Sequence, residues 1–285
     1  MMHSMTSVIH PADRLCNAID GVGAPLCVGL DPVYEKMPTE LQSFTTLEAF
    51  KIFCEGTIDA VTGIAAALKF QSACFERLGA EGVALLGDLR HKASEQGLEV
   101  ILDAKRGDIG ISAEHYAASA TADGPCDWIT VNPYLGIDGI EPFLDAGLGV
   151  FCLVRTSNPS GDAIQKQPLL DGRNVAESIA DLLATCGEKY IGTKGWSSLG
   201  AVVGATKPDE AMQLRSRMPK QMFLMPGIGA QGASPERIAT CFGDGHGALA
   251  TASRSVIYPT LQTDWQSDIA EAATQLANEL QGKAT

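Results

Sequence analysis

The sequence lacks the features that mark secreted, membrane and zinc-binding proteins. Its eight cysteines include no Cys-x-x-Cys pair, and its five histidines have no spacing typical of a metal site. No apolar run approaches the ~18–20 residues of a membrane span. The N-terminus has no basic segment followed by a long apolar stretch, so we predict no signal peptide. We therefore expect a reduced, cytoplasmic protein with no membrane partner and no metal.

Basic residues are also scarce. The chain has 21 Lys and Arg against 34 Asp and Glu, which gives a formal net charge of −13. Such a protein repels polyanions at long range, so nucleic-acid binding is a poor hypothesis. With 45% hydrophobic and 19% charged residues, the composition is that of a globular protein with a large core. Any small anion must be bound in a local positive pocket.

Short apolar segments recur along the chain and alternate with longer ones. In eight runs nearly every position is apolar, as in parallel strands that are buried on both faces. These runs are Leu26–Leu30, Ala65–Phe70, Val100–Ala104, Trp128–Val131, Val150–Val154, Leu199–Val203, Met222–Met225 and Ala248–Ala252. Other stretches have apolar residues every three to four positions, which predicts helices. They are Leu47–Val61, Phe75–Gln96, Val175–Lys189, Pro208–Arg217 and Asp264–Leu280.

This alternation predicts a single α/β domain over residues 1–285, folded as a (β/α)8 TIM barrel. Residues 1–24 would form an N-terminal extension and helix. The polar segment 156–168 follows the fifth strand, where a lid-like loop would be useful. A doubly wound open sheet is the structural alternative.

Charged residues follow several of the predicted strands, at the face where barrel enzymes place their active sites. Asp103 and Lys105 end the third strand, and because side chains alternate along a strand, both point into the barrel mouth. Lys69 ends the neighbouring strand, and Asp108 lies just beyond the third. The carboxylates would keep the lysines protonated, which makes them proton donors rather than nucleophiles. An ion-pair network that only stabilises the barrel is the alternative.

A glycine-rich segment follows the seventh strand, and an arginine follows the eighth. Gly227-x-Gly229-x-x-Gly232 has the spacing of a dinucleotide fingerprint, but that fingerprint normally occupies the first βα turn of its domain. In a barrel, the loops after strands seven and eight bind phosphate through backbone N–H groups and a helix N-terminus. Arg254 would add a bidentate partner. We predict a phosphate site here; the alternative is a tight turn beside a surface arginine.

These motifs resemble those of the orotidine 5′-monophosphate decarboxylase family. The sequence Asp103-x-Lys105-x-x-Asp108, within Leu-Asp-Ala-Lys-Arg-Gly-Asp-Ile-Gly, is similar to the family signature. The third-strand motif and the long segment after the fifth strand are similar to the longer bacterial (type 2) branch. Ser253 differs from the glycine that many relatives of other branches carry. Further matching segments follow in the family's order: Gly29-Leu30-Asp31-Pro32, Leu68-Lys69-Phe70-Gln71, Pro226-Gly227-Ile228-Gly229-Ala230-Gln231-Gly232 and Ser253-Arg254.

The resemblance implies that the protein converts orotidine 5′-monophosphate (OMP) to UMP and CO2 in de novo pyrimidine biosynthesis, without a metal or organic cofactor. Lys105 would protonate C6 of the pyrimidine as CO2 leaves, and Asp103 would face the substrate carboxylate. Asp31 and Lys69 would hold the ribose hydroxyls, and Lys69 would also join the charged constellation. A fixed cation suits this reaction because the C6 carbanion has no adjacent π-system to absorb its charge.

The resemblance also assigns residues to the two ends of the nucleotide. Ser157 would bond the pyrimidine amide. The phosphate would be held by the Gln231 side chain, the backbone of Gly229 and Ala230, and Arg254. Phosphate binding far from C6 could close the lid and use remote binding energy in the chemical step.

A homodimer is implied as well. Asp108 would come from the partner subunit and complete the charged constellation, so each active site would be shared. Ile109 and Ser112 would line the pyrimidine ring and the ribose. The implied partners are therefore a small-molecule substrate and a second copy of the chain, with no nucleic acid.

Three alternatives stay open. A magnesium-dependent sugar-phosphate lyase or synthase, such as hexulose-phosphate synthase, has a similar third strand, but the Gly-Leu-Asp-Pro and Lys-Phe-Gln segments argue against it. A Schiff-base aldolase would use Lys105 or Lys69, which the flanking carboxylates disfavour. A catalytically inactive nucleotide-binding module would bind UMP without turnover.

Overall fold

The computed structural model describes residues 9–228, 235–260 and 264–281. Eight parallel strands form a closed barrel in sequence order, with β1 hydrogen-bonded to both β2 and β8. The closed order confirms the predicted (β/α)8 barrel and excludes the open sheet. The strands are β1 (Leu26–Leu30), β2 (Ala67–Gln71), β3 (Glu99–Arg106), β4 (Trp128–Val131), β5 (Gly149–Arg155), β6 (Ser197–Val203), β7 (Gln221–Pro226) and β8 (Ala248–Ala252).

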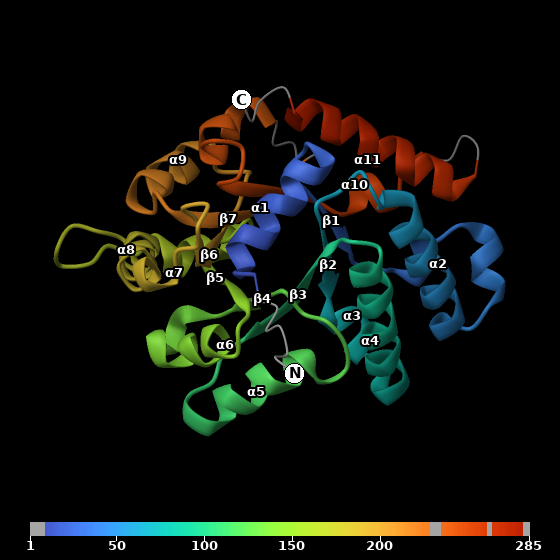
Figure 1. The fold of residues 1–285 in the computed structure, drawn as a ribbon, viewed down its shortest axis with the longest axis horizontal. Coiled ribbons are helices and arrows are strands. Elements are labelled where there is room, and N and C mark those ends of the chain that lie inside the picture. Colours follow the sequence, from blue (N-terminus) through green and yellow to red (C-terminus); the bar gives the residue numbers. More distant parts are fainter. Residues whose placement is uncertain (1–8, 229–234, 261–263, 282–285) are drawn as a thin grey trace, which may run out of the picture.

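Helices surround this barrel (Figure 1). The α-helices are α1 (Pro11–Val22), α2 (Thr46–Val61), α3 (Ser72–Glu76), α4 (Gly79–Glu95), α5 (Gly110–Ala122), α6 (Glu141–Asp145), α7 (Asp162–Gln165), α8 (Val175–Gly187), α9 (Pro208–Arg217), α10 (Arg254–Ile257) and α11 (Trp265–Gln281). The 3-10 helices are η1 (Tyr34–Lys36), η2 (Thr39–Ser43), η3 (Pro133–Leu135), η4 (Ile137–Gly139), η5 (Pro159–Gly161), η6 (Glu188–Tyr190) and η7 (Pro235–Phe242). Within the described ranges, none of the helices is long and apolar enough to cross a bilayer.

Local signals explain where several helices begin and end. Thr45 begins α2 with a capping box, in which its side chain and that of Glu48 each bond the other's backbone N–H. The predicted helix 75–96 is instead divided into α3 and α4 at Gly79, whose φ of +71° favours glycine. The segment 156–168 is more than a loop, since it contains η5 and α7.

The barrel interior is filled from one end by large side chains. Trp128 of β4 and Phe151 of β5 stack with 4.4 Å between their ring centroids, and both are fully buried. Leu15 and Ile19 of α1 belong to the same buried cluster, and α1 crosses the barrel in Figure 1. α1 therefore closes the N-terminal end of the barrel and leaves the opposite end for a cavity.

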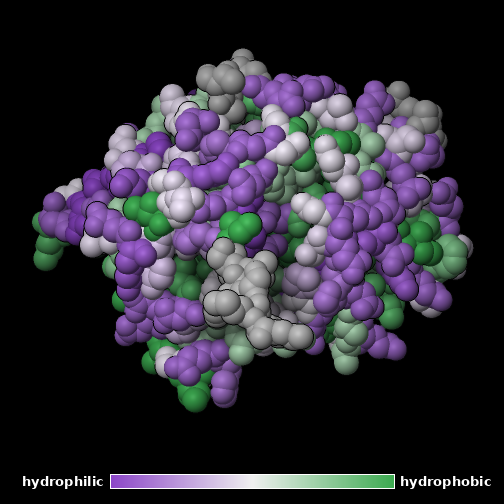
Figure 2. Space-filling model, in the orientation of Figure 1, coloured by the Kyte–Doolittle hydropathy of each residue, from purple (hydrophilic) through white to green (hydrophobic). Residues whose placement is uncertain are grey.

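The exterior is mainly polar on the face drawn in Figure 2. The described residues there present a hydrophilic surface with small, separated hydrophobic patches. Among the described acidic residues, Asp13, Glu99, Asp103 and Asp268 are buried and the others are at least partly exposed, so solvated side chains carry most of the acidic excess.

Candidate active site

A cavity of about 850 Å³ opens at the C-terminal ends of the strands. Its polar wall is formed by residues at or just after the ends of β1, β2, β3 and β4. Apolar side chains come from β5, β6 and β7, and the segment after β5 adds mainly polar ones. Among the predicted site residues, the cavity is lined by Asp31, Lys69, Asp103, Lys105, Ser157 and Arg254. The structure thus gathers residues that are far apart in sequence at the face that the strand pattern predicts.

Lys69 lies at the centre of a chain of charges along this polar wall. Its Nζ lies 3.0 Å from Asp103 Oδ2 and 3.3 Å from Asp31 Oδ1. Lys69 and Asp103 are buried, whereas Asp31 is partly exposed. The ends of β1, β2 and β3 are adjacent in the barrel, so consecutive strands bring these three groups together.

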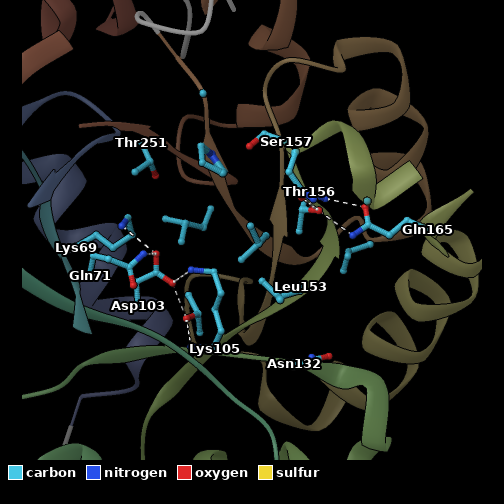
Figure 3. A pocket seen from close by; sticks show the side chains of 18 of the residues that line it. Lys69, Gln71, Asp103, Lys105, Asn132, Leu153, Thr156, Ser157, Gln165 and Thr251 are labelled. Atoms are coloured by element: carbon cyan, nitrogen blue, oxygen red, sulfur yellow. Dashed lines mark hydrogen bonds and ion pairs between the residues drawn. The ribbon is translucent and has the colours of Figure 1, made fainter. Parts of the chain in front are cut away.

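Lys105 extends the chain of charges into the cavity. Its Nζ lies 2.6 Å from Asp103 Oδ1, so each carboxylate oxygen of Asp103 bonds one lysine. Figure 3 shows Lys69 and Lys105 on opposite sides of Asp103. Unlike Lys69, the Lys105 side chain is half exposed. A proton on Lys105 can therefore reach a ligand in the cavity and can be replaced from solvent.

The pKa values of the buried pair show how the charges support each other. Burial alone would raise the pKa of Asp103, but the ammonium groups of Lys69 and Lys105 outweigh burial and lower this pKa to about 2. Burial also disfavours the charge on Lys69, yet Asp31 and Asp103 raise its pKa above the ordinary lysine value. Both groups are therefore ionised at neutral pH.

Asp108 does not join this chain of charges within one subunit. It follows β3, and its Oδ1 accepts the backbone N–H of Ile109 at 2.9 Å. Neither Asp108, Ile109 nor Ser112 lines the cavity, and the Ile109 side chain is 56% exposed. Within one chain, three of the four predicted charged groups therefore come together, whereas the segment that carries Asp108 is directed outward.

The segment 156–168 lies along the cavity and places Ser157 in its wall. Gln165 of α7 ties this segment together: its Oε1 accepts the backbone N–H of Thr156, and its Nε2 donates to Thr156 Oγ1 at 2.8 Å (Figure 3). The same Oε1 accepts Nη1 of the buried Arg155 at 3.0 Å. The lid-like segment is therefore anchored at its base by the last residue of β5.

The structure describes only part of the predicted phosphate site. Gly227 and Arg254, which begins α10, both line the cavity. Gly229, Ala230 and Gln231 lie outside the described residues.

Ser253, which precedes Arg254, packs closely over the neighbouring strand. A Cβ on Gly29 would come within 1.9 Å of Ser253 Oγ. Gly29 therefore leaves the space that the Ser253 hydroxyl occupies.

Some cavity residues were not assigned a role from the sequence. Gln71 Nε2 donates to Asp103 Oδ2 at 3.2 Å, and Thr130 Oγ1 donates to Asp103 Oδ1 at 2.9 Å. Side-chain alternation along β2 and β4 could have indicated both, because Gln71 follows Lys69 by two positions and Thr130 precedes Asn132 by two. Gln165 carries no comparable sequence signal.

The carboxylates of the cavity are occupied by lysines. Asp31 and Asp103 both pair with Lys69. In the part of the chain that the structure describes, no three His, Cys, Asp or Glu side chains are grouped to hold a metal ion. The arrangement suits proton transfer and the binding of a small charged molecule.

Known proteins are similar to this chain in sequence and in fold over most of its length. Residues 24–256 match the family model described as Orotidine 5'-phosphate decarboxylase / HUMPS family. The orotidine 5'-phosphate decarboxylase of Rhodopirellula baltica is 36% identical over an alignment that covers 95% of this chain and 99% of the relative. That of Deinococcus radiodurans is 41% identical, with 82% of this chain and 84% of the relative covered.

A solved structure agrees with these sequence matches. The OMP decarboxylase of Leishmania donovani superposes with a TM-score of 0.81 at 32% identity and covers 97% of this chain and 99% of its own. The matched segment includes every strand of the barrel and every charged residue of the cavity wall. The chain therefore belongs to the orotidine 5′-phosphate decarboxylase / HUMPS family.

Proposed function

We propose that the protein is an orotidine 5′-phosphate decarboxylase, a carboxy-lyase that converts OMP to UMP and CO2 in pyrimidine biosynthesis. The observation that carries this proposal is the Lys69–Asp103–Lys105 chain of charges in the cavity wall. Family membership and relatives of this name over most of the chain support it.

Lys105 is the proton donor of the proposed reaction. The bond between C6 and the carboxylate carbon breaks, and its electron pair remains on C6 as CO2 leaves. A Lys105 N–H then transfers its proton to C6, which gives UMP and a neutral amine that solvent reprotonates. Before transfer, the ammonium charge stabilises the carbanion, and Asp103 orients that ammonium group.

The other cavity residues bind the ribose, the pyrimidine and the phosphate of OMP. Asp31 and Lys69 hold the ribose hydroxyls, and Ser157 bonds the pyrimidine amide. Arg254 grips the phosphate together with Gln231, Gly229 and Ala230. Support comes from the placement of Asp31, Lys69, Ser157 and Arg254 around one cavity.

Each site is shared across a homodimer. The partner's copy of the segment after β3 supplies Asp108, with Ile109 and Ser112 against the ring and ribose. The outward direction of this segment supports the assignment, as does the apolar surface beside it: Ile111 is 67% exposed and Tyr134 of η3 is 85% exposed. Burial of such side chains against a second copy would stabilise the dimer.

The chemistry of the cavity disfavours the lyase and aldolase alternatives. A magnesium-dependent lyase needs carboxylates free to bind the ion, whereas Asp31 and Asp103 are neutralised by Lys69. A Schiff-base enzyme needs a neutral amine, whereas the pKa of Lys69 is raised, because its carboxylate partners outweigh burial.

We place the enzyme in the cytoplasm. All eight cysteines fall within the described ranges and are free thiols, and most are buried. Free thiols in this number suit a reducing compartment, where disulfides are rare.

A direct assay tests the proposed activity. Purified protein is incubated with OMP in the presence of EDTA, and loss of orotate absorbance is followed together with release of UMP and CO2. The proposal predicts turnover that EDTA leaves unchanged. Activity that EDTA abolishes would favour the lyase reading, and tight UMP binding without turnover would identify an inactive binding module.

A further inference from the structure

Lys105 has a backbone conformation that is unusual for a residue with a side chain. Its φ is +46°, and it is the sole non-glycine residue with a positive φ within the described ranges. This left-handed conformation is strained for a lysine and persists only where surrounding contacts hold it. The strain falls on the residue whose Nζ pairs with Asp103 at 2.6 Å.

The hydroxyl of Thr130 contacts both Lys105 and its partner carboxylate. Thr130 Oγ1 accepts the backbone N–H of Lys105 at 2.9 Å and donates to Asp103 Oδ1 at 2.9 Å. Lys105 Nζ bonds the same Asp103 oxygen. The threonine side chain is buried. One hydroxyl therefore fixes both the backbone of the lysine and the carboxylate oxygen that receives its ammonium group.

The pairing of β3 with β4 shows why a side chain is needed here. Leu102 pairs with Ile129, and the next pair is Arg106 with Val131. Thr130 thus stands opposite the irregular stretch of β3, where the ladder of backbone hydrogen bonds is interrupted. Its hydroxyl takes up an N–H that the interrupted ladder does not pair, as expected at a bulge that redirects a side chain.

We propose that Thr130 is a positioning residue for the decarboxylation, acting through Lys105. The inference rests on the proposed function, since it concerns proton transfer from that lysine. A lysine stem is long and flexible, so its ammonium group reaches a reacting carbon reproducibly only if both its backbone and its partner carboxylate are fixed. Thr130 itself contacts neither the Lys105 Nζ that donates the proton nor the C6 that receives it.

Three variants test this role. Thr130→Val removes the hydroxyl at nearly constant volume, Thr130→Ala removes it without placing a methyl group against the two polar partners, and Thr130→Ser keeps it. We expect kcat to fall by about 10- to 100-fold in the valine and alanine variants. The Kd for UMP should stay within about threefold, because the groups that bind the nucleotide remain. The serine variant should recover kcat to within about threefold of wild type.

Thr57→Val is the matched control. Thr57 is a buried threonine of α2 whose hydroxyl bonds the Phe53 carbonyl, and it does not line the cavity. This variant should lose stability without losing kcat. The positioning role is wrong if Thr130→Val and Thr130→Ala keep kcat within about twofold of wild type. It is also wrong if Thr130→Ser fails to recover kcat while remaining folded, or if UMP affinity falls in parallel with kcat.

Crystal structures of the variants separate this inference from the proposed function. In Thr130→Val or Thr130→Ala, we expect Lys105 to leave the left-handed region and its pair with Asp103 to lengthen, whatever reaction the protein catalyses. An unchanged Lys105 in both would overturn the inference. If instead wild-type protein does not decarboxylate OMP, the proposed function fails while the structural result still stands or falls by itself.

Discussion

Two buried carboxylates of strand β3 have pKa values shifted in opposite directions. Glu99 begins the strand at the barrel end closed by α1, and Asp103, four positions further along, faces the cavity. Burial and the neighbouring Asp127 carboxylate raise the pKa of Glu99 to about 8, against the weaker effect of Arg14. At the cavity, burial is outweighed by two lysines, and the pKa of Asp103 falls to about 2.

The difference follows from how cations are shared. Arg14 lies 2.6 Å from Asp127 but 3.4 Å from Glu99, so one arginine serves two carboxylates and favours the other one. Asp103 has a lysine on each oxygen. Burial therefore protonates a carboxyl at the closed end and leaves one ionised at the open end. We infer that charge at the cavity serves chemistry, whereas charge at the closed end affects stability.

The largest expected effect is that of Lys105→Ala. Removal of the proton donor and its charge should reduce kcat by at least about 10⁴-fold, because proton transfer and electrostatic stabilisation are lost together. UMP binding through the phosphate end should persist. Lys92→Ala is the control, since Lys92 pairs with Asp59 on the surface; kcat near the wild-type value in Lys105→Ala would contradict the proposed mechanism.

Mixed dimers test whether the active site needs Asp108 from a second chain. Asp108→Ala and Lys69→Ala proteins should each be nearly inactive alone. In a heterodimer one of the two sites receives both intact residues, so about half of the wild-type activity per dimer should return. Purified heterodimers without recovered activity would show that Asp108 is not shared.

Arg254→Ala should have an intermediate effect. Loss of a charge-assisted contact to phosphate should lower kcat/KM by about 10- to 100-fold. The decrease should be largely absent with a substrate that lacks the phosphate, because such a substrate cannot use Arg254. An unchanged kcat/KM for OMP would remove Arg254 from the site.

Glu99→Gln should change stability at high pH rather than turnover. The folded-state pKa of Glu99 is raised to about 8, whereas the unfolded value is about 4.3. Stability from the protonated group is thus complete below about pH 4 and is lost as pH rises through about 8. Between pH 5 and 9, the free energy of unfolding of the wild-type protein, measured in urea, should fall by about 2–4 kcal/mol more than that of the variant.

Turnover gives the complementary result for Glu99→Gln. The variant should keep wild-type kcat at neutral pH, because Glu99 lies at the end of β3 remote from the cavity. A parallel pH dependence of stability in both proteins, or a large loss of kcat, would contradict the inference that Glu99 affects stability rather than catalysis.

Most of the barrel could be predicted because its strands are buried on both faces and carry a continuous apolar signal. Trp128–Val131 and Ala248–Ala252 were predicted to the residue. Helix α5 is not among the stretches of predicted helical periodicity, because its buried side is made of small residues, Ala113, Ala117 and Ala120, which give little apolar periodicity. The break at Gly79 depends on a positive φ that spacing alone does not reveal.

Only some features of the candidate site could be predicted from the sequence. Strand alternation was enough to place Asp103 and Lys105 together, and the neighbouring strand brought Lys69 to them. The outward direction of Asp108 depends on the turn after β3, and the role of Thr130 depends on an irregular register. Neither feature can be obtained from residue types, because both arise from the path of the backbone.

The hydrogen-bonded junction of β1 with β8 has a consequence for folding. They are the first and last strands of the barrel, and their pairing, such as Cys27 with Thr251, joins segments that lie far apart along the chain. Contacts this distant in sequence form slowly. In the proposed binding mode, Asp31 holds the ribose and Arg254 the phosphate from opposite sides of this junction, so a chain whose barrel has not closed cannot bind the nucleotide through both. Ligand binding during refolding would thus report the moment when the ring of strands closes.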